Sequence, residues 1–552
     1  MKTIDEIKSH TIQLVDDLKA TCATYGLGGD GNEYKIITYM FLYKFLNDKF
    51  GHDIKQIPQK AYASRINSAE SWEAELRKFT KEEFEDCLSY LDPDTPKLKP
   101  SHFLSNIWNQ SAKGDFSTLL DNTLVDIAKY NEDIFSMKTE SETRLSLFEK
   151  VTIYVPDVEK RDAFARALVS RLTNFSFEDV FTRNEGYDFF SVIFEYLIKD
   201  YNKDGGGKYA EYYTPHSVAS IMARLLVKPG EQICDVTCYD PSAGTGTLLM
   251  AIAHAIGEDR CEIYSQDISQ KSSKMLLLNL ILNNLVHSIP NVIQGDTLVS
   301  PYHRDDRTKA LKKFDYIVSN PPFKLDFSDT RSKIAEDTTR FFAGVPKVPN
   351  KKKESMAIYL CFLQHIIYSL SDKGKACVVV PTGFLTAQSG IEFAIREHIV
   401  EKKMLAGVVS MPSNIFATTG TNVSVLFFDK SHGIKPVILI DASKLGEKIK
   451  EDGNQKTKLK DAEIDKIVTA FHEHTAEDGF SVEVTREQLK EKNYSFSAGQ
   501  YFDIKIEYVE ITEDEFQQKL ADFQTTLADL SKQGNDLDAK IAEQLKKLRF
   551  NP

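Results

Sequence analysis

One short motif in this sequence can act chemically on an amino group. The apolar run FDYIVS is followed by Asn320, Pro321, Pro322 and Phe323, so a strand is expected to end at two consecutive prolines. Proline has a fixed φ and no backbone N–H, so the carbonyls beside it are not held in a ladder and can face a ligand. The Asn320 side-chain oxygen and the Pro321 carbonyl would then accept both N–H hydrogens of an adenine N6 amine and direct its lone pair at an electrophilic methyl group.

Phe323 adds an aromatic face to this motif. A base must leave its duplex before an enzyme can reach its exocyclic nitrogen, and an aromatic ring can stack on the extruded base. Asparagine and proline are also common in turns, so the same residues could simply end a strand. The segments that precede the motif favour the chemical interpretation.

A turn with two glycines lies upstream, directly after the run QICDVTCYD. Glycines let backbone N–H groups approach a ligand closely, although a Gly-x-Gly turn alone is weak support for a nucleotide site. No Walker-type Lys-Ser/Thr follows this turn, which argues against ATP. The residues expected at the cofactor are Asp240, Ser242, Ala243, Gly244, Thr245 and Gly246.

Acidic residues end the next two predicted strands. EIYSQD ends at Asp267, where a carboxylate can accept hydrogen bonds from ribose hydroxyls. NVIQGD ends at Asp296, where a carboxylate could accept from an adenine amino group. Either aspartate could instead cap a helix. Three successive strands ending in ligand-type residues favour a ligand that contains ribose and adenine.

The elements that must position these residues follow from the spacing of apolar side chains. Residues 1 to about 165 have helical spacing, as in Glu33–Phe50. From about Phe175, helical stretches alternate with short apolar runs, which is typical of a doubly wound α/β sheet. A polar stretch, Glu451–Lys466, then separates this sheet from the end of the chain. The predicted strands lie in QICDVTCYD, EIYSQD, NVIQGD, FDYIVSNPPF, KACVVVPTGF, AGVVSMP and VSVLFFDK.

The tail has a narrow apolar stripe on a charged helix, interrupted at Gly534. Such a stripe is covered by another helix, and the sequence leaves open whether that helix belongs to this chain or to a partner. The stripe consists of Phe516, Leu520, Phe523, Leu527, Leu530, Leu537, Ile541, Leu545 and Leu548.

Composition limits the partners and the compartment. The net charge of -12 argues against a broad nucleic-acid surface, so any DNA contact is expected to be local or shared with a partner. The 7 cysteines include no CxxC pair, and no apolar run is long enough to cross a bilayer, so we expect a cytoplasmic protein with neither a membrane segment nor a metal site. Positive charge gathers after the proline motif, at Lys324, Arg331, Lys333, Arg340, Lys347, Lys351, Lys352 and Lys353.

Together these motifs resemble the gamma-type amino methyltransferases, and within them the modification subunits of type I restriction-modification systems. DPSAGTG is similar to the family's cofactor loop, NPPF is similar to its catalytic tetrapeptide, and the loop precedes the tetrapeptide as in the gamma order. GGGKYAEYYTPHSVASIM is similar to the segment just upstream, whereas Ser265–Asp267 stands where relatives more often have a glycine and a glutamate. The resemblance implies further cofactor contacts at Glu211, Tyr212, Tyr213, Thr214, Pro215 and His216.

The resemblance implies a doubly wound, Rossmann-like methyltransferase sheet with an all-helical amino-terminal domain and a helical tail. We expect a helical domain at 1–165 that contacts DNA or a partner, a methyltransferase domain at 166–505 and an assembly helix at 506–552.

The implied reaction is methyl transfer from S-adenosylmethionine to adenine N6 of double-stranded DNA, with Asn320, Pro321, Pro322 and Phe323 as the catalytic residues. The implied partners are a specificity subunit, further copies of this chain and a restriction subunit. Methylation of cytosine N4, of RNA or of protein glutamine remains the alternative, because related sites act on those amines. Lys347, Lys351, Lys352 and Lys353 are the candidate DNA contacts.

Overall fold

The structure is a computed structural model that describes residues 3–29, 31–182, 189–190, 192–197, 214–416, 422–451, 454–502 and 512–547. The chain forms two compact units, Met1–Phe502 and Asp503–Pro552, and each is described by itself. Within the described ranges, no helix combines the length and the apolar character that crossing a membrane requires.

The first unit is organised around an 11-stranded sheet with the order β13-β10-β8-β9-β7-β6-β3-β4-β5-β1-β2. Strands β6, β3, β4 and β5 run parallel to their neighbours, whereas β9 is antiparallel to both β7 and β8, and β2 is antiparallel to β1. The strands of this sheet are β1 (Ser136–Thr139), β2 (Arg144–Ser146), β3 (Val236–Asp240), β4 (Cys261–Asp267), β5 (Val292–Gln294), β6 (Phe314–Ser319), β7 (Leu370–Pro381), β8 (Leu405–Ser410), β9 (Val423–Asp429), β10 (Val437–Asp441) and β13 (Ser481–Val484).

The strand order reverses between β3 and β6. The chain builds β3, β4 and β5 outward in one direction, then returns and adds β6 on the other side of β3. In open α/β sheets, ligands bind beyond the carboxyl ends of the strands at such a reversal. Asp240 ends β3 and Asn320 follows β6, so this topology places the predicted cofactor loop and the proline motif at one crevice.

Helices cover both faces of the sheet, as expected when alternate residues of a strand point to opposite faces. Cys377 and Val379 of β7 pack in the hydrophobic cluster that includes helices α12, α13, α14 and α18, whereas Val378 and Val380 pack in the cluster of α16, α17 and α19. These helices, with the short α15, are α12 (His216–Leu226), α13 (Thr247–Ile256), α14 (Gln270–Leu282), α15 (Arg331–Ala335), α16 (Tyr359–Ser369), α17 (Gly390–Glu401), α18 (Asp461–Glu473) and α19 (Arg486–Glu491).

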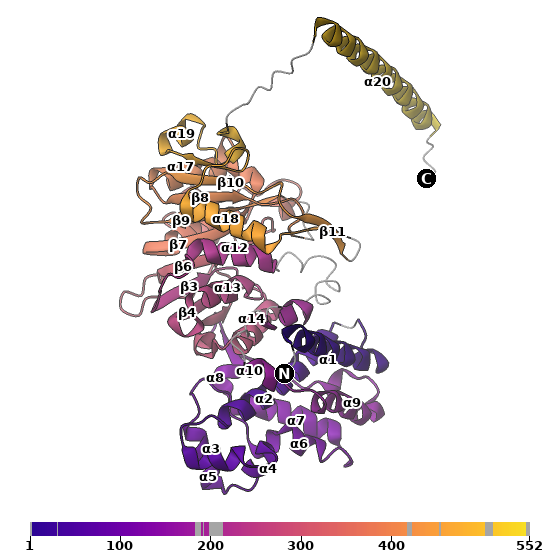
Figure 1. Ribbon diagram of the computed structural model, residues 1–552, viewed down its shortest axis with the longest axis vertical. Coiled ribbons are helices and arrows are strands. Elements are labelled where there is room, and N and C mark those ends of the chain that lie inside the picture. The colour runs from indigo at the N-terminus through magenta and orange to yellow at the C-terminus, as the bar shows by residue number, and fades with distance from the viewer. Residues whose placement is uncertain are drawn as a thin grey trace. The chain divides into compact units, whose positions relative to one another are not determined.

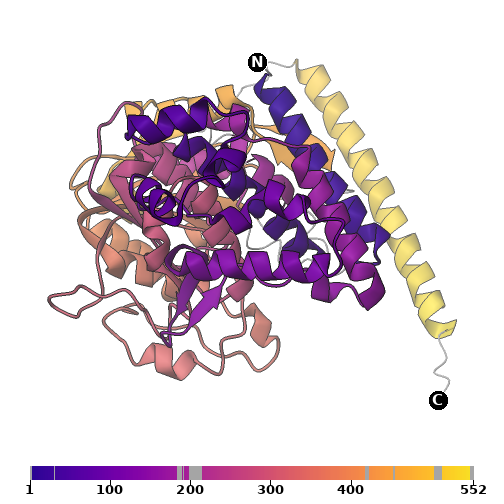
Figure 2. The same ribbon diagram turned by 90° about the horizontal axis from the view of Figure 1, so that it is seen from below.

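The amino-terminal region is mostly helical, as the sequence predicts, and packs beside the β4 and β5 side of the sheet (Figures 1 and 2). It differs from the prediction in one respect, because the hairpin β1–β2 joins the sheet, and β1 pairs in parallel with β5. Strands this short give no periodic signal in a sequence. The helices are α1 (Ile4–Thr24), α2 (Glu33–Ile54), α3 (Lys60–Asn67), α4 (Trp72–Leu76), α5 (Lys81–Ser89), α6 (Leu104–Trp108), α7 (Phe116–Tyr130), α8 (Glu132–Phe135), α9 (Arg161–Thr173) and α10 (Glu178–Phe181).

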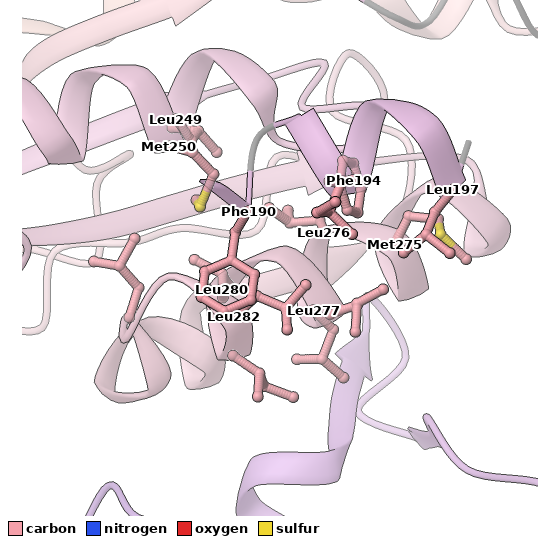
Figure 3. Close-up of a cluster of buried hydrophobic side chains, with 14 of the residues drawn as sticks. Phe190, Phe194, Leu197, Leu249, Met250, Met275, Leu276, Leu277, Leu280 and Leu282 are labelled. Atoms are coloured by element: carbon pink, nitrogen blue, oxygen red, sulfur yellow. The ribbon is translucent and has the colours of Figure 1, made fainter. Parts of the chain in front are cut away.

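A shared hydrophobic cluster joins the segment after α10 to the sheet helices. Phe190 and Phe194 lie against leucines of α14, among them Leu276 and Leu280 (Figure 3). Both phenylalanine side chains are almost completely buried, at 4% and 2% exposed. Burying large apolar side chains contributes about 2 kcal/mol each, so this contact fixes the segment that leads into the site.

All seven predicted strands are present, as β3 to β9. The chain also adds β10 and β13 at the far edge of the sheet, where β13 is antiparallel to β10. The polar stretch Glu451–Lys466 therefore does not end the sheet. It contributes the strand β12 (Asn454–Lys458), which pairs with β11 (Glu447–Glu451), and the start of α18.

The second unit contains one described helix, α20 (Glu513–Lys547), which passes through Gly534 without a break. Its apolar stripe is exposed: Phe516 is 50%, Phe523 71%, Leu527 67% and Ile541 55% exposed. Nothing within this unit covers the stripe in the part that the structure describes.

Candidate active site

Asn320 lies just beyond β6, with its side-chain amide held in one orientation. The amide Nδ2 donates a hydrogen bond to the Thr214 hydroxyl at 3.2 Å. Thr214 is buried and immediately precedes Pro215, the N-cap residue of α12. Because the NH2 end of the amide is occupied, its oxygen is the end that can face a ligand.

Both predicted acceptors are available for a substrate amine. Among the hydrogen bonds of the described residues, none uses the Asn320 side-chain oxygen or the Pro321 carbonyl. The prolines have no N–H of their own, so no sheet neighbour competes for these oxygens. The geometry therefore leaves two acceptors at the carboxyl end of β6.

A buried hydrogen-bond network ties this end of β6 to the end of β3. The Ser319 hydroxyl donates to the Asp240 carboxylate at 3.0 Å and lies 2.7 Å from the Ser242 hydroxyl. The Ser242 backbone N–H also donates to Asp240, at 2.9 Å. Burial raises the pKa of Asp240 to about 7, although these donors lower it. Asp240 is only 1% exposed, so its carboxylate holds the start of the predicted cofactor loop from inside the protein.

The glycine turn is shaped by a second buried carboxylate. Gly244 donates its N–H to Asp267 at 2.8 Å, and Ser269 donates to the other oxygen of Asp267 at the same distance. Burial raises the pKa of Asp267 above its ordinary value. Gly246 has φ +84, and a Cβ there would lie 2.2 Å from Leu276, so only glycine fits this turn against α14. Asp267 thus connects the ends of β3 and β4.

Asp296 stands at the end of β5 beside the amino-terminal hairpin. One carboxylate oxygen accepts from the backbone N–H groups of Leu298 and Val299, at 2.9 and 3.2 Å. The Asp296 backbone N–H donates to Glu140, which follows β1, at 3.1 Å. Asp296 is half-buried, and no hydrogen bond among the described residues uses its second carboxylate oxygen. The amino-terminal region therefore forms part of this edge of the site.

Phe323 is half-buried between the two large hydrophobic clusters. Its ring meets Tyr359 of α16 edge to face, at 6.2 Å between centroids and 75° between planes. This contact fixes one edge of the phenylalanine ring, as an aromatic stacking surface requires.

The segment after Phe323 is a folded lobe with a small core of its own. Phe327, Ile334, Phe341 and Met356 pack with Leu298 in that core. Not all eight cations of this segment face solvent. Arg340 is 3% exposed and donates to the carbonyls of Thr297 and Leu298, at 3.2 and 2.5 Å.

Arg331 is likewise used inside the lobe, where it donates to the carbonyls of Pro346 and Val345 at 2.9 and 3.1 Å. The exposed cations of the lobe are Lys324, Lys333, Lys347, Lys351, Lys352 and Lys353.

The structure brings most of the predicted site residues to the carboxyl ends of the neighbouring strands β6, β3, β4 and β5. Glu211, Tyr212 and Tyr213 lie outside the described residues, whereas Pro215 caps the helix that His216 begins. Ala243 and Thr245 lie in the glycine turn between Ser242 and Gly246. Sequence reasoning missed Ser319 and Glu140, because a serine inside a strand and a glutamate in a distant hairpin carry no local signal. Nor did it anticipate that Thr214 contacts Asn320.

Three comparisons relate this chain to known proteins. A family model described as N-6 DNA Methylase matches residues 185–508. The "Type I restriction enzyme MpnII methylase subunit" of Mycoplasma pneumoniae is 29% identical over 366 residues, which cover 64% of this chain and 65% of that protein. The MjaIX methylase subunit of Methanocaldococcus jannaschii is 28% identical over 66% of this chain and 64% of its own. The chain therefore spans somewhat less than two thirds of these relatives.

Among solved structures, a type I restriction-modification methyltransferase subunit from Streptococcus thermophilus has a TM-score of 0.70. It is 21% identical, and the match covers 90% of this chain and 100% of that one. A modification subunit of a type I restriction enzyme from Vibrio vulnificus has a TM-score of 0.53 at 17% identity, covering 87% and 93%. At these identities the likeness shows a shared fold.

Proposed function

The chain belongs to the N-6 DNA methylase family, and from this premise we propose that it transfers a methyl group from S-adenosylmethionine to N6 of adenine in double-stranded DNA. The observation that carries this proposal is the orientation of Asn320. Thr214 occupies the NH2 end of its amide, so the amide oxygen and the Pro321 carbonyl form a pair of acceptors. An exocyclic amine offers the two N–H hydrogens that such a pair accepts.

The residues around the crevice fit the adenosyl part of S-adenosylmethionine. Asp267 and Asp296 present carboxylates at the ends of β4 and β5, which suit the ribose hydroxyls and the adenine amino group. The glycine turn provides the close backbone approach beside them. When bound, S-adenosylmethionine supplies the electrophilic methyl group.

The residues of this chain would act on the target base by position and electrostatics. Asn320 and Pro321 accept from the N6 amine and so make its lone pair available. Phe323 stacks on the extruded base, and Tyr359 holds the Phe323 ring. The network of Asp240, Ser242 and Ser319 keeps the cofactor loop and the acceptor pair at a constant separation.

We further propose that the chain is the modification subunit of a type I complex. Its net charge of -12 leaves DNA binding to local surfaces, such as Lys347 and Lys351 to Lys353, and to a partner that selects the DNA sequence. The stripe of α20 fits a helix of a specificity subunit, because it is apolar, narrow and exposed.

Substitution of Asn320 by alanine tests the proposed reaction. The variant loses one acceptor of the target amine, so we expect methyl transfer to fall by about 10²–10³-fold while cofactor binding stays near wild type. Asn174→Ala, at the exposed end of α9, is the matched control. The assay is mass spectrometry of nucleosides from DNA of cells that express the chain with its partner subunits.

The products distinguish the proposed reaction from its alternatives. N6-methyladenine that disappears in Asn320→Ala and persists in Asn174→Ala supports the proposal. N4-methylcytosine, or a methylated protein with unmodified DNA, would assign the site to another amine. Normal N6-methyladenine in Asn320→Ala would refute the acceptor role.

A further inference from the structure

The strands β11 and β12 form a ribbon that is separate from the main sheet. They pair antiparallel with each other, from Glu447 opposite Lys458 to Glu451 opposite Asn454, and make up a two-stranded sheet of their own. Figure 1 shows β11 projecting from the body of the first unit. The proposed catalytic chemistry makes no use of this ribbon.

The base of the ribbon is anchored firmly. Thr457 is 3% exposed, and its hydroxyl donates to the Ser413 carbonyl at 2.7 Å. Its backbone N–H donates to the Asn414 carbonyl at 3.0 Å. Leu459, just beyond β12, is buried in the large hydrophobic cluster at 4% exposed. The ribbon is therefore held at a defined place on the unit.

The anchor lies at the carboxyl ends of the parallel strands, the same side of the sheet as the proposed catalytic motif. β9 is antiparallel to both β8 and β7, and β7 is parallel to β6, so β8 runs in the same direction as β6. Ser413 and Asn414 follow β8, just as Asn320 follows β6. Three strand spacings of about 4.8 Å separate β8 from β6, which places the anchor about 14 Å from the line of β6.

The ribbon is basic, although the chain as a whole is acidic. Lys448, Lys450 and Lys458 are exposed, and no ion pair among the described residues involves them. Lys460 lies 3.7 Å from Glu447. From 444 to 460 the acidic residues are Glu447, Glu451 and Asp452, and they are outnumbered by Lys444, Lys448, Lys450, Lys456, Lys458 and Lys460.

We propose that this ribbon binds the backbone of duplex DNA beside the target base. A two-stranded β-ribbon fits the major groove of DNA, and lysines neutralise phosphates along its walls. The distance of about 14 Å corresponds to about four steps of 3.4 Å along a DNA strand, so the ribbon reaches the duplex that flanks an extruded base. This inference rests on the proposed function, because it takes DNA as the substrate.

The test removes three exposed lysine charges from the ribbon. A control removes three from the other side of the sheet, where the parallel strands begin. The ribbon variant is Lys448→Ala, Lys450→Ala and Lys458→Ala. The control is Lys228→Ala, Lys373→Ala and Lys435→Ala, three exposed lysines that lie before β3, near the start of β7 and before β10. The full chain is titrated onto a short fluorescent duplex of mixed sequence between about 50 and 200 mM salt.

We expect the ribbon variant to bind more weakly and to depend less on salt. Each phosphate contact contributes about 0.9 to the slope of log affinity against log salt, so the slope should fall by up to about 2.7 while the control keeps the wild-type slope. Thermal unfolding midpoints equal to wild type would show that both variants are folded. Equal slopes in the ribbon variant and the control would overturn the proposal, as would a wild-type chain that does not bind the duplex.

A partner protein is the competing occupant of the ribbon. If the ribbon variant loses a partner subunit during purification and keeps its salt slope, the ribbon binds protein and the proposal is wrong. Failure of the proposed function would look different, because wild-type protein would then bind DNA through the ribbon without forming N6-methyladenine.

Discussion

Replacement of Thr214 by valine isolates the contact that orients Asn320. Valine has nearly the shape of threonine but cannot accept the hydrogen bond that Asn320 Nδ2 donates at 3.2 Å. Without it, the amide can turn about its terminal bond and present NH2 to the target amine. The proposed acceptor is then lost for part of the time, although Asn320 is still present.

The size of the effect follows from the strength of one hydrogen bond. A neutral hydrogen bond contributes about 0.5–1.5 kcal/mol net, which biases the two amide orientations by a factor of about 2 to 12. Without the bond the two orientations become about equally populated, so we expect Thr214→Val to lower kcat by at most about 2-fold. Asn320→Ala should lower it far more, by about 10²–10³-fold, because the acceptor itself is gone.

A double-mutant cycle separates this role from a cofactor contact. We would measure kcat and the Kd for S-adenosylmethionine in Thr214→Val, Asn320→Ala and the double variant, with Thr214→Ser as the conservative control. If Thr214 acts through Asn320, the double variant equals Asn320→Ala, serine restores kcat, and the cofactor Kd stays constant. A raised Kd with unchanged kcat in Thr214→Val, or losses that add in the double variant, would refute the orienting role and return Thr214 to the cofactor.

Two further predictions concern the buried acid and the tail. Burial raises the pKa of Asp240 to about 7, so the folded protein keeps this proton at pH 5, where the unfolded chain has lost it, and the stabilisation that it provides falls as the pH rises through 7. Asp240→Asn cannot titrate, so its thermal midpoint should improve relative to wild type between pH 5 and 8, whereas a constant difference would contradict the assignment. Deletion of residues 512–552 should leave the first unit folded, by circular dichroism, and abolish co-purification with the proposed specificity subunit. Leu527→Asp on the stripe should act like the deletion and Thr525→Asp on the opposite face should not; full co-purification of Leu527→Asp would place the interface elsewhere.

The family and the architecture of the sheet could be predicted because their determinants are local. Apolar runs bounded by turns mark β3 to β9, and all seven are present. The glycine turn and NPPF carry their residue types for conformational reasons that apply wherever they occur, as the fit of Gly246 against Leu276 shows. The family that these motifs predict is the one whose model matches residues 185–508.

Only the tertiary structure determines which side chains of the site contact one another and which remain exposed. Thr214 lies far before Asn320 in the chain, and only the fold brings the residue before the N-cap of α12 to the end of β6. Likewise, Arg340 and Lys353 belong to one basic segment, yet Arg340 is buried against the carbonyls of Thr297 and Leu298 while Lys353 remains exposed.

The hairpin β1–β2 and the ribbon β11–β12 likewise depend on tertiary structure and not on local sequence alone. Their residues are mostly polar and their strands short, so no periodicity marks them, and pairing with β5 or with each other is what makes them strands. Local sequence determines which backbone conformations are favourable and which side chains are available. Burial, charge pairing and the orientation of a single amide depend on residues distant in the chain, and therefore only the folded structure determines them.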